Sequence, residues 1–259
     1  MSIEFDLKDS LGPLAQHQGL IAILDALGAA KYSRDAIDQF LRSREIIFDQ
    51  LRDKASRLGI DATKVTVFTF NDTVLIVYRT DEAVTLKDVQ AFGELLRKFE
   101  ISSLAQGILF RGAISIGAFF VDAATNTVMG DAVTDAAAWY DRADWIGITA
   151  TPQATLLIQS LLEQGGKDLD RLMVDYAVPI KDQSAVALKA VNWPKAFFVK
   201  GMTPCSGNEK QRAKCLSLLA RHGVPKGTES KYFNTMKFFD HCNELRIAVE
   251  KKKSNTAKR

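Results

Sequence analysis

Two stretches of the chain have the apolar pattern of strands. An acidic residue follows the first stretch and interrupts the second. Residues 18–24 form an apolar run rich in isoleucine and leucine, which stops at Asp25 and a glycine-containing turn. Such a short, bounded run predicts a buried strand. Residues 65–78 contain two halves rich in β-branched and aromatic residues, which meet at Asn71 and Asp72. An Asn-Asp pair between such halves predicts a tight hairpin.

The segments between these strands have the spacing of helices, and the order of elements indicates the fold class. We predict helices over residues 33–58, 86–104, 132–143, 152–163, 209–221 and 232–251. We predict further strands over residues 107–120 and 127–129 and within residues 174–199. The order over residues 18–143 is therefore β-α-β-β-α-β-β-α. It favours an α+β fold, in which helices pack on an antiparallel sheet and a helical extension follows.

The length of the chain, 259 residues, allows one large domain with an extension. We predict a main domain over residues 1–170 and an extension over residues 171–250 that completes this domain or forms a dimer arm. Residues 251–259 include five Lys and Arg, and we predict that they form a disordered basic tail.

Composition narrows the classes of protein that need to be considered. Apolar residues make up 47% and charged residues 25%, which is ordinary globular usage. Apolar stretches fall well short of the roughly 20 residues that span a bilayer, so no membrane partner is expected. Residues 1–10 carry acids before any apolar segment, unlike a signal peptide, which predicts a cytoplasmic protein. The net charge of +3 comes without a basic stripe interleaved with aromatics, so no nucleic-acid partner is expected.

The two strand-end acids are the strongest chemical signal in the sequence. An acid beside a buried strand costs desolvation energy unless something compensates its charge. A divalent metal ion does so, and Mg²⁺ prefers a few carboxylates together with phosphate oxygens. Forty-seven residues separate Asp25 from Asp72, so only the fold can bring them together. The alternative is ordinary cap and turn chemistry, in which both residues only shape the backbone.

Four motifs together resemble the class III adenylate and guanylate cyclases. The first is an Asp followed three residues later by Gly, and in the second Asn replaces the usual Gly before Asp. The third resembles the family's Arg-x-Gly-Ile-x-x-Gly strand, and the fourth its Gly-x-x-Val helix start. The segments are Asp25 with Gly28, Asn71-Asp72, residues 111–117 and residues 130–133, in the family's order within residues 18–160.

This resemblance implies the class III cyclase-like fold, a ferredoxin-like or palm-like antiparallel sheet with helices packed on it. It implies that Asp25 and Asp72 bind two divalent metal ions, Mn²⁺ or Mg²⁺, with the carbonyl of Ala26 as a third ligand. The backbone from Ala26 through Gly28 to Ala29 would meet the triphosphate of a nucleoside triphosphate substrate. Family members build each site from two protomers, so a homodimer is expected.

The sequence departs from the purine cyclases on the helix that follows Gly-x-x-Val. The family has an Asn and an Arg four residues apart there, and this chain has Thr134 and Ala138. Thr134 therefore stands at a substrate-binding position. Arg142, one turn further along the predicted helix, and Arg111 are the candidates for the catalytic arginine. The alternative for Arg142 is an ordinary surface residue.

The positions that select a purine base also differ. Phe68 and Thr127 stand where adenylate cyclases have a base-binding Lys and Asp. A phenylalanine offers no hydrogen-bond donor and adds bulk that disfavours a two-ring base. A threonine hydroxyl both donates and accepts, so it does not separate uracil from cytosine. The alternative is that Phe68 belongs to the core and other residues select the base.

Three segments resemble a narrower group, the pyrimidine cyclases of the Pycsar anti-phage system. These segments are residues 111–115, 191–194 and 231–235, and they extend the match to nearly the whole chain. The resemblance implies conversion of UTP or CTP to cyclic UMP or cyclic CMP. Between the two substrates, we expect UTP to be slightly favoured. The product would activate a separate effector protein in antiviral defence.

Three other functions remain open at the level of sequence. The missing Asn and Arg are compatible with a degenerate, cyclase-like nucleotide-binding module. A purine cyclase with a rebuilt base pocket would retain both acids. A two-metal polymerase-type enzyme on a related palm-like sheet would also use paired carboxylates.

Overall fold

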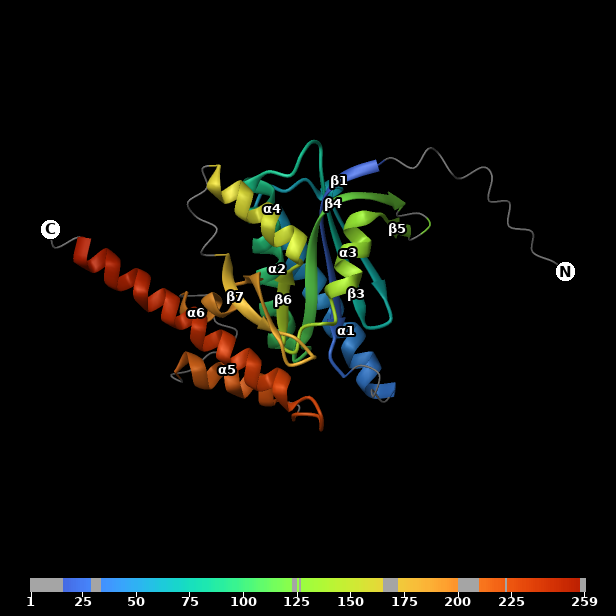
Figure 1. The fold of residues 1–259 in the computed structure, drawn as a ribbon. Helices are drawn as coiled ribbons and strands as arrows, with labels where there is room; N and C mark the ends of the chain where they lie inside the picture. The colour runs from blue at the N-terminus through green and yellow to red at the C-terminus, as the bar shows by residue number, and fades with distance from the viewer. Residues whose placement is uncertain are drawn as a thin grey trace.

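The computed structural model describes residues 16–28, 34–122, 125, 127–164, 172–199, 210–221 and 223–256. Its centre is a sheet with the strand order β2-β3-β1-β4-β6-β8-β7, and β5 pairs with the far part of β4 (Figure 1). The strands are β1 (Gln16–Ala26), β2 (Val65–Phe70), β3 (Thr73–Thr80), β4 (Phe110–Asp122), β5 (Thr127–Met129), β6 (Gly147–Ala150), β7 (Met173–Pro179) and β8 (Ala185–Val191). The pairs are antiparallel except β4–β6, which is parallel. The predicted α+β fold with a largely antiparallel sheet is confirmed.

Helices cover both faces of this sheet. They are α1 (Arg34–Arg57), α2 (Leu86–Gln106), α3 (Asp131–Trp139), α4 (Pro152–Glu163), α5 (Gln211–Ala220) and α6 (Glu229–Thr256), with the short 3-10 helices η2 (Ala62–Lys64) and η4 (Trp193–Phe198). Helix α2 begins with a capping box between Thr85 and Asp88 and ends at Gly107, whose φ of 78° is favoured in glycine. None of the helices in the described ranges has the length and apolar character needed to cross a membrane.

Three predictions about the elements were wrong. Helix α3 ends at Trp139 rather than Ala143, because the chain turns at Tyr140 toward β6. Strand β6 was not predicted at all. Helix α6 continues to Thr256, so residues 251–256 of the expected disordered tail are helical, and residues 257–259 lie outside the described residues.

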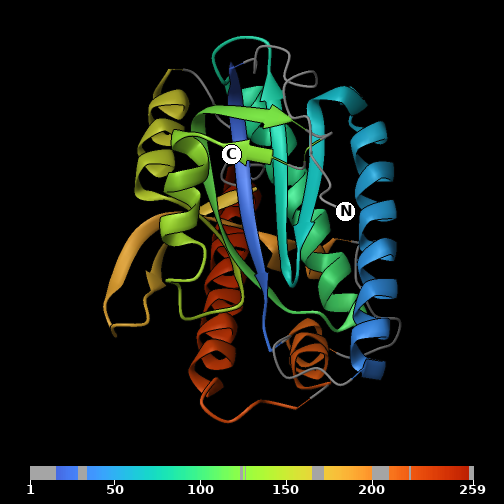
Figure 2. The same ribbon diagram turned by 90° about the vertical axis from the view of Figure 1, so that its right-hand side faces the viewer.

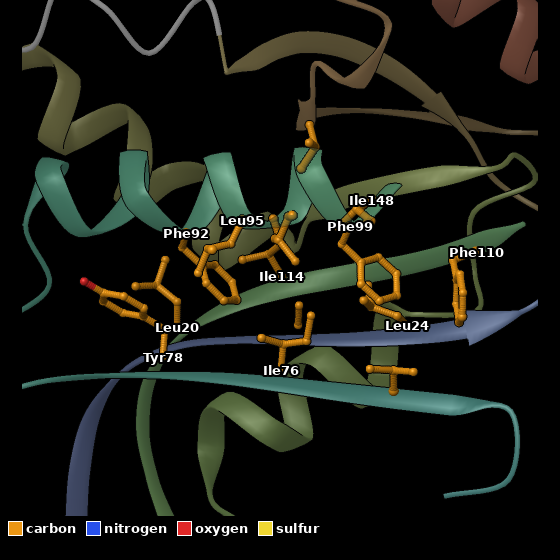
Figure 3. Close-up of a cluster of buried hydrophobic side chains, with 14 of the residues drawn as sticks. Leu20, Leu24, Ile76, Tyr78, Phe92, Leu95, Phe99, Phe110, Ile114 and Ile148 are labelled. Carbon is orange, nitrogen blue, oxygen red and sulfur yellow. The ribbon is translucent and has the colours of Figure 1, made fainter. Parts of the chain in front are cut away.

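Alternation along β1 divides the core into two layers. Leu20 and Leu24 point to the face covered by α1 and α2, where Phe92 and Phe99 pack on them (Figure 3). Ile21 and Ile23 point to the opposite face, where they pack with Ala132 and Ala136 of α3 and with other apolar side chains. Asp25 continues this second set, because residues two apart share a face of a strand. It therefore emerges on the α3 face.

The segment after residue 171 adds to the same sheet and packs a second apolar cluster. Strand β8 pairs with β6 at Thr149 and Ala190, and β7 pairs with β8 along its whole length. Helices α5 and α6 lie together at one end of the molecule (Figure 1, Figure 2). Between them and the sheet lie buried aromatic side chains from the α3–β6 turn, η4 and α6, namely Trp145, Trp193, Phe197, Phe238 and Phe239.

Candidate active site

The fold places Asp25 and Asp72 at neighbouring strand ends. Asp25 is paired with Thr73 at the start of β3, and Asp72 occupies the β2–β3 turn beside it. The backbone N–H of Ala26 donates to the carbonyl of Asp72 at 3.1 Å, which extends the β1–β3 ladder into the turn. Asn71 has a φ of 52°, a left-handed conformation that Asn tolerates well in tight turns. The predicted hairpin and the predicted approach of the two acids are both present.

Arg111 holds the carboxylate of Asp25 through a single oxygen. It lies opposite Asp25 on β4, and its Nε and Nη2 donate to Oδ2 of Asp25 at 3.1 and 2.9 Å. Its Nη1 donates to the backbone carbonyl of Asp141 at 2.8 Å. The Arg111 and Asp25 side chains are only 12% and 19% exposed. Because both bonds end on Oδ2, Arg111 fixes the orientation of the carboxylate and does not use Oδ1.

The electrostatic setting of Asp25 is that of a crowded acidic site. Burial raises the pKa of Asp25, and the negative charges of Asp72 and Asp141 raise it further, against the opposing effect of Arg111. Burial raises the pKa of Tyr140 as well, and the negative charges of Asp141 and Asp25 raise it further. A hydrogen bond from Lys181 lowers the pKa of Asp141. These negative charges therefore favour the binding of a cation at the site.

The residues present fit a divalent cation that completes its shell with other oxygens. Within the described part of the chain, no group of three or more His, Cys, Asp and Glu side chains is arranged to hold a metal. Two carboxylates suit Mg²⁺ or Mn²⁺ when substrate phosphates or water supply further ligands. Gly28 has a φ of 83° with open space where a Cβ would point, so ligand can approach the backbone there. Ala29 lies outside the described residues.

A hollow of about 300 Å³ lies beside the acids on the α3 face. It is lined mainly by apolar side chains from β1, β2, β3 and β5: Ile23, Phe68, Thr69, Phe70, Thr73, Leu75 and Val128. Ile23 lies two residues before Asp25, and Thr73 is the β3 residue that pairs with Asp25, so the hollow adjoins the carboxylates. Phe68 is 8% exposed and belongs both to this wall and to the core beneath it. The two interpretations of Phe68 are therefore compatible.

Thr127 and Thr134 are not brought into the hollow. The hydroxyl of Thr127 bonds to Thr125, whereas its neighbour Val128 faces the hollow. The hydroxyl of Thr134 donates to the carbonyl of Gly130 at 3.2 Å, on the exposed face of α3. Ala138 is exposed on the same helix.

Arg142 does not lie on α3, contrary to the sequence-based expectation. The helix ends three residues earlier, and the exposed Arg142 stacks over the ring of Trp139 at 4.7 Å from its centroid. The neighbouring Asp141, which sequence reasoning missed, contacts the site: its backbone carbonyl accepts a hydrogen bond from Arg111. No sequence signal marked it, because the Ala-rich helical pattern continued through this turn.

Comparison with solved structures finds cyclase domains among the similar ones. No family model and no curated protein matches the chain. A rhodopsin-guanylyl cyclase catalytic core with converted specificity, in complex with ATPαS, is 14% identical over 69% of this chain and 97% of its own, with a TM-score of 0.46. The adenylyl cyclase CyaB from P. aeruginosa is 15% identical over 68% and 94%, with a TM-score of 0.42. The guanylate cyclase domain of RhGC from Catenaria anguillulae, in complex with GTP, is 14% identical over 69% and 98%, with a TM-score of 0.45.

Identities of 14–15% and TM-scores below 0.5 do not assign the chain to a family. The case for a function therefore depends on the site residues themselves.

Proposed function

We propose that the protein is a nucleotide cyclase, which converts a nucleoside triphosphate into a 3′,5′-cyclic nucleotide and pyrophosphate. The observation that carries the proposal is the convergence of Asp25 and Asp72 beside a hollow, with Asp25 oriented by Arg111 through one oxygen. The motifs that resemble class III cyclases contribute the strand ends, the turn and the arginine of this site.

In the proposed reaction, the ribose 3′-oxygen forms a bond to the α-phosphorus, the bond to the pyrophosphate oxygen breaks, and the hydroxyl proton passes to water. Two divalent cations, when bound, would supply charge neutralisation and a lowered pKa of the hydroxyl. Asp25 and Asp72 would hold them, with the Ala26 carbonyl as a further ligand. Arg111 occupies Oδ2 of Asp25 and so leaves Oδ1 to bind a cation. The backbone at Gly28 leaves room for the triphosphate.

For the base, we propose a pyrimidine, with UTP slightly ahead of CTP. The wall of the hollow offers the ring of Phe68 and few polar groups, which gives an adenine or guanine edge little to bond with. Thr127 no longer contributes to this choice, since its hydroxyl bonds within the Thr125 turn. The preference for a pyrimidine therefore rests on this apolar wall and on the resemblance to the Pycsar enzymes, which also implies a separate effector and a role in anti-phage defence.

We further propose that the active form is a homodimer and that residues 1–170 carry the catalytic residues. The apolar Phe70 at the hairpin is 74% exposed and Met129 is 50% exposed, beside the hollow, which favours burial against a second copy. Mixing an Asp25→Ala protein with a Phe68→Arg protein should restore activity if the acids of one copy act together with the Phe68 wall of the other. Unmixed variants serve as controls.

A cyclase-like binding module is the second candidate. Thr134 and Ala138, both exposed on α3, stand where the purine cyclases have an Asn and an Arg. Arg142 does not take the place of this absent arginine, and both observations favour the binding module. The deciding experiment incubates the protein with Mn²⁺ and each of UTP, CTP, ATP and GTP, and identifies products by mass spectrometry. A cyclic pyrimidine nucleotide supports the proposal, a cyclic purine nucleotide corrects the base, and binding without any product favours the module.

A further inference from the structure

A single turn connects the candidate active site to the C-terminal part of the chain. It joins α3 to β6 and includes Asp141, whose carbonyl receives the third hydrogen bond of Arg111. Two of the three Arg111 bonds orient Asp25, and this third one fixes the guanidinium itself. The position of the turn therefore determines where Arg111 holds the carboxylate.

The β7–β8 hairpin holds one side of this turn. The N–H of Lys181 donates to the carbonyl of Arg142 at 3.0 Å, and its Nζ donates to Oδ2 of Asp141 at 2.8 Å. The N–H of Asp144 donates to the carbonyl of Pro179 at 2.8 Å. These contacts involve mostly backbone atoms, so side-chain substitution would not test them cleanly.

Helix α6 holds the other side through side chains of its first two turns. Nδ2 of Asn234 donates to the carbonyl of Asp144 at 2.9 Å. Nζ of Lys231 lies 3.4 Å from Oδ1 of Asp144, and the two side chains are only 13% and 17% exposed. The buried hydroxyl of Thr235 accepts from the N–H of Ile146 at 2.8 Å.

This use of α6 follows from the short pairing between β6 and β8. Strand β8 pairs with β6 only at Thr149 and Ala190, so the N–H of Ile146 has no strand partner. A buried N–H without a partner is costly, and Thr235 provides one. Asn234, which comes directly before it, then reaches the carbonyl of Asp144, three residues after Asp141.

We propose that Asn234 is a positioning residue for the candidate cation site. By holding the Asp141–Asp144 turn, it keeps Arg111 where both of its bonds to Asp25 end on Oδ2. The inference rests on the proposed role of Asp25 in binding a divalent cation. It assigns the C-terminal helix an indirect part in the site, since the helix touches neither acid in the described contacts and acts through the turn and Arg111.

The test measures Mn²⁺ binding to the full-length protein by electron paramagnetic resonance, well below the melting temperature and without nucleotide. Asn234→Asp keeps the size of the side chain but replaces the donor with a carboxylate beside Asp144. Asn234→Ala removes the side chain. Asn243→Ala is the matched control, because Asn243 lies on the same helix and accepts hydrogen bonds from Arg246, away from the turn. We expect about tenfold weaker Mn²⁺ binding for both Asn234 variants, the size typical of residues that support metal ligands, and no change for Asn243→Ala.

Two further variants separate a positioning role from a general loss of structure. In an Arg111→Lys background, Asn234→Ala should have little additional effect on Mn²⁺ binding, because the bond it supports is already lost. An equal effect in both backgrounds would overturn the inference, as would Asn234 variants that bind Mn²⁺ like the control. Asp25→Asn tests the underlying site: if it leaves Mn²⁺ binding unchanged, the proposed function fails first, independently of Asn234.

Discussion

Arg111 and Asp25 face each other across β4 and β1, and the guanidinium donates two hydrogen bonds to the one oxygen Oδ2. Eighty-six residues separate them in the chain, and the antiparallel register of the two strands brings them together. The pair is mostly buried, so neither charge can be removed without consequence for the other. It links the stability of the sheet to the chemistry proposed at the ends of its central strands.

Arg111→Met should lower the free energy of unfolding by about 3 kcal/mol, because it leaves a mostly buried carboxylate without its compensating charge. The double variant Arg111→Met, Asp25→Asn should recover part of this loss, since both charges are then absent. Urea unfolding of the four proteins in this cycle measures the coupling. Strictly additive effects would show that the two side chains do not stabilise each other.

The Asp25 carboxyl should titrate above the usual value for aspartate, which is about 3.9. Because its pKa is raised in the folded state, the folded protein keeps this proton at pH values where the unfolded chain has lost it. Its contribution to stability is therefore fully present below the unfolded pKa and is lost as pH rises through the folded pKa. A ¹³C NMR titration measures the folded value directly.

Asp72→Asn is the matched variant for this titration. It removes one of the negative charges that raise the pKa of Asp25, so the midpoint should move down while burial keeps it above the usual value. An Asp25 midpoint that is unaffected by the substitution would contradict the proximity of the two acids.

Glu100 on α2 should destabilise the protein increasingly as pH rises. Burial raises its pKa well above the usual value, against the opposing bond from the N–H of Ile148, and its Oε2 has no hydrogen-bond partner in the described structure. The folded state therefore binds a proton that the unfolded chain releases, and stability falls as pH increases toward the folded pKa. Glu100→Gln mimics the protonated acid, so its stability relative to wild type should increase between pH 5 and pH 8.

Glu94→Gln, on the same helix, provides the opposite control. Burial alone would raise the pKa of Glu94, but Lys54, whose Nζ lies 2.9 Å from Oε2, and Arg97 together lower it. This variant should therefore lose stability relative to wild type as pH rises through the folded pKa to the unfolded value of about 4.3, and the deficit should stay constant above it. If both variants showed the same pH slope in thermal melts, the assignment of Glu100 as a buried neutral acid would be wrong.

Gly112→Ala should destabilise the sheet directly beside the site. A Cβ at this position would lie 2.4 Å from the carbonyl oxygen of Ile23 and 2.5 Å from Cδ2 of Leu24, closer than real atoms approach. We expect a loss of about 3 kcal/mol or more, as for severe overpacking. Gly93→Ala is the control, because the new methyl group would be 3.7 Å from its nearest neighbour and in a helix interior. It should be neutral or stabilise by about 0.5–1 kcal/mol, which calorimetry can distinguish.

The parts of the fold that could be predicted from sequence are those with a regular apolar period or a marked turn. The β1 run before Asp25, the Asn71-Asp72 hairpin and the helices α1, α2 and α4 all have such signals. Strand β6 has only four residues, all buried, so it offers no alternation to detect. Its position depends on pairing with β4, which is a tertiary contact.

The sequence indicated the two acids and, through the family resemblance, Arg111 and Phe68, but it did not indicate the contacts that join them. The partner of Asp25 depends on strand register, and the role of Asp141 depends on a backbone carbonyl, which any residue could provide. Arg142 was misplaced because alanines continue the helical pattern up to residue 143, whereas packing ends α3 at Trp139. Side-chain identity alone cannot signal contacts of this kind.

The central claim is that Asp25 and Asp72 act together in nucleotide cyclisation. The most direct measurement compares the turnover of UTP, CTP, ATP and GTP by the wild-type protein, Asp25→Asn and Asp72→Asn with Mn²⁺, after circular dichroism has shown that all three are folded. We predict that the wild type forms a cyclic pyrimidine nucleotide and pyrophosphate, and that each substitution lowers turnover at least about 1000-fold, a loss of roughly 4 kcal/mol of transition-state stabilisation. Near-normal turnover in either variant, or no cyclic product from the wild type with any of the four nucleotides, would contradict the account.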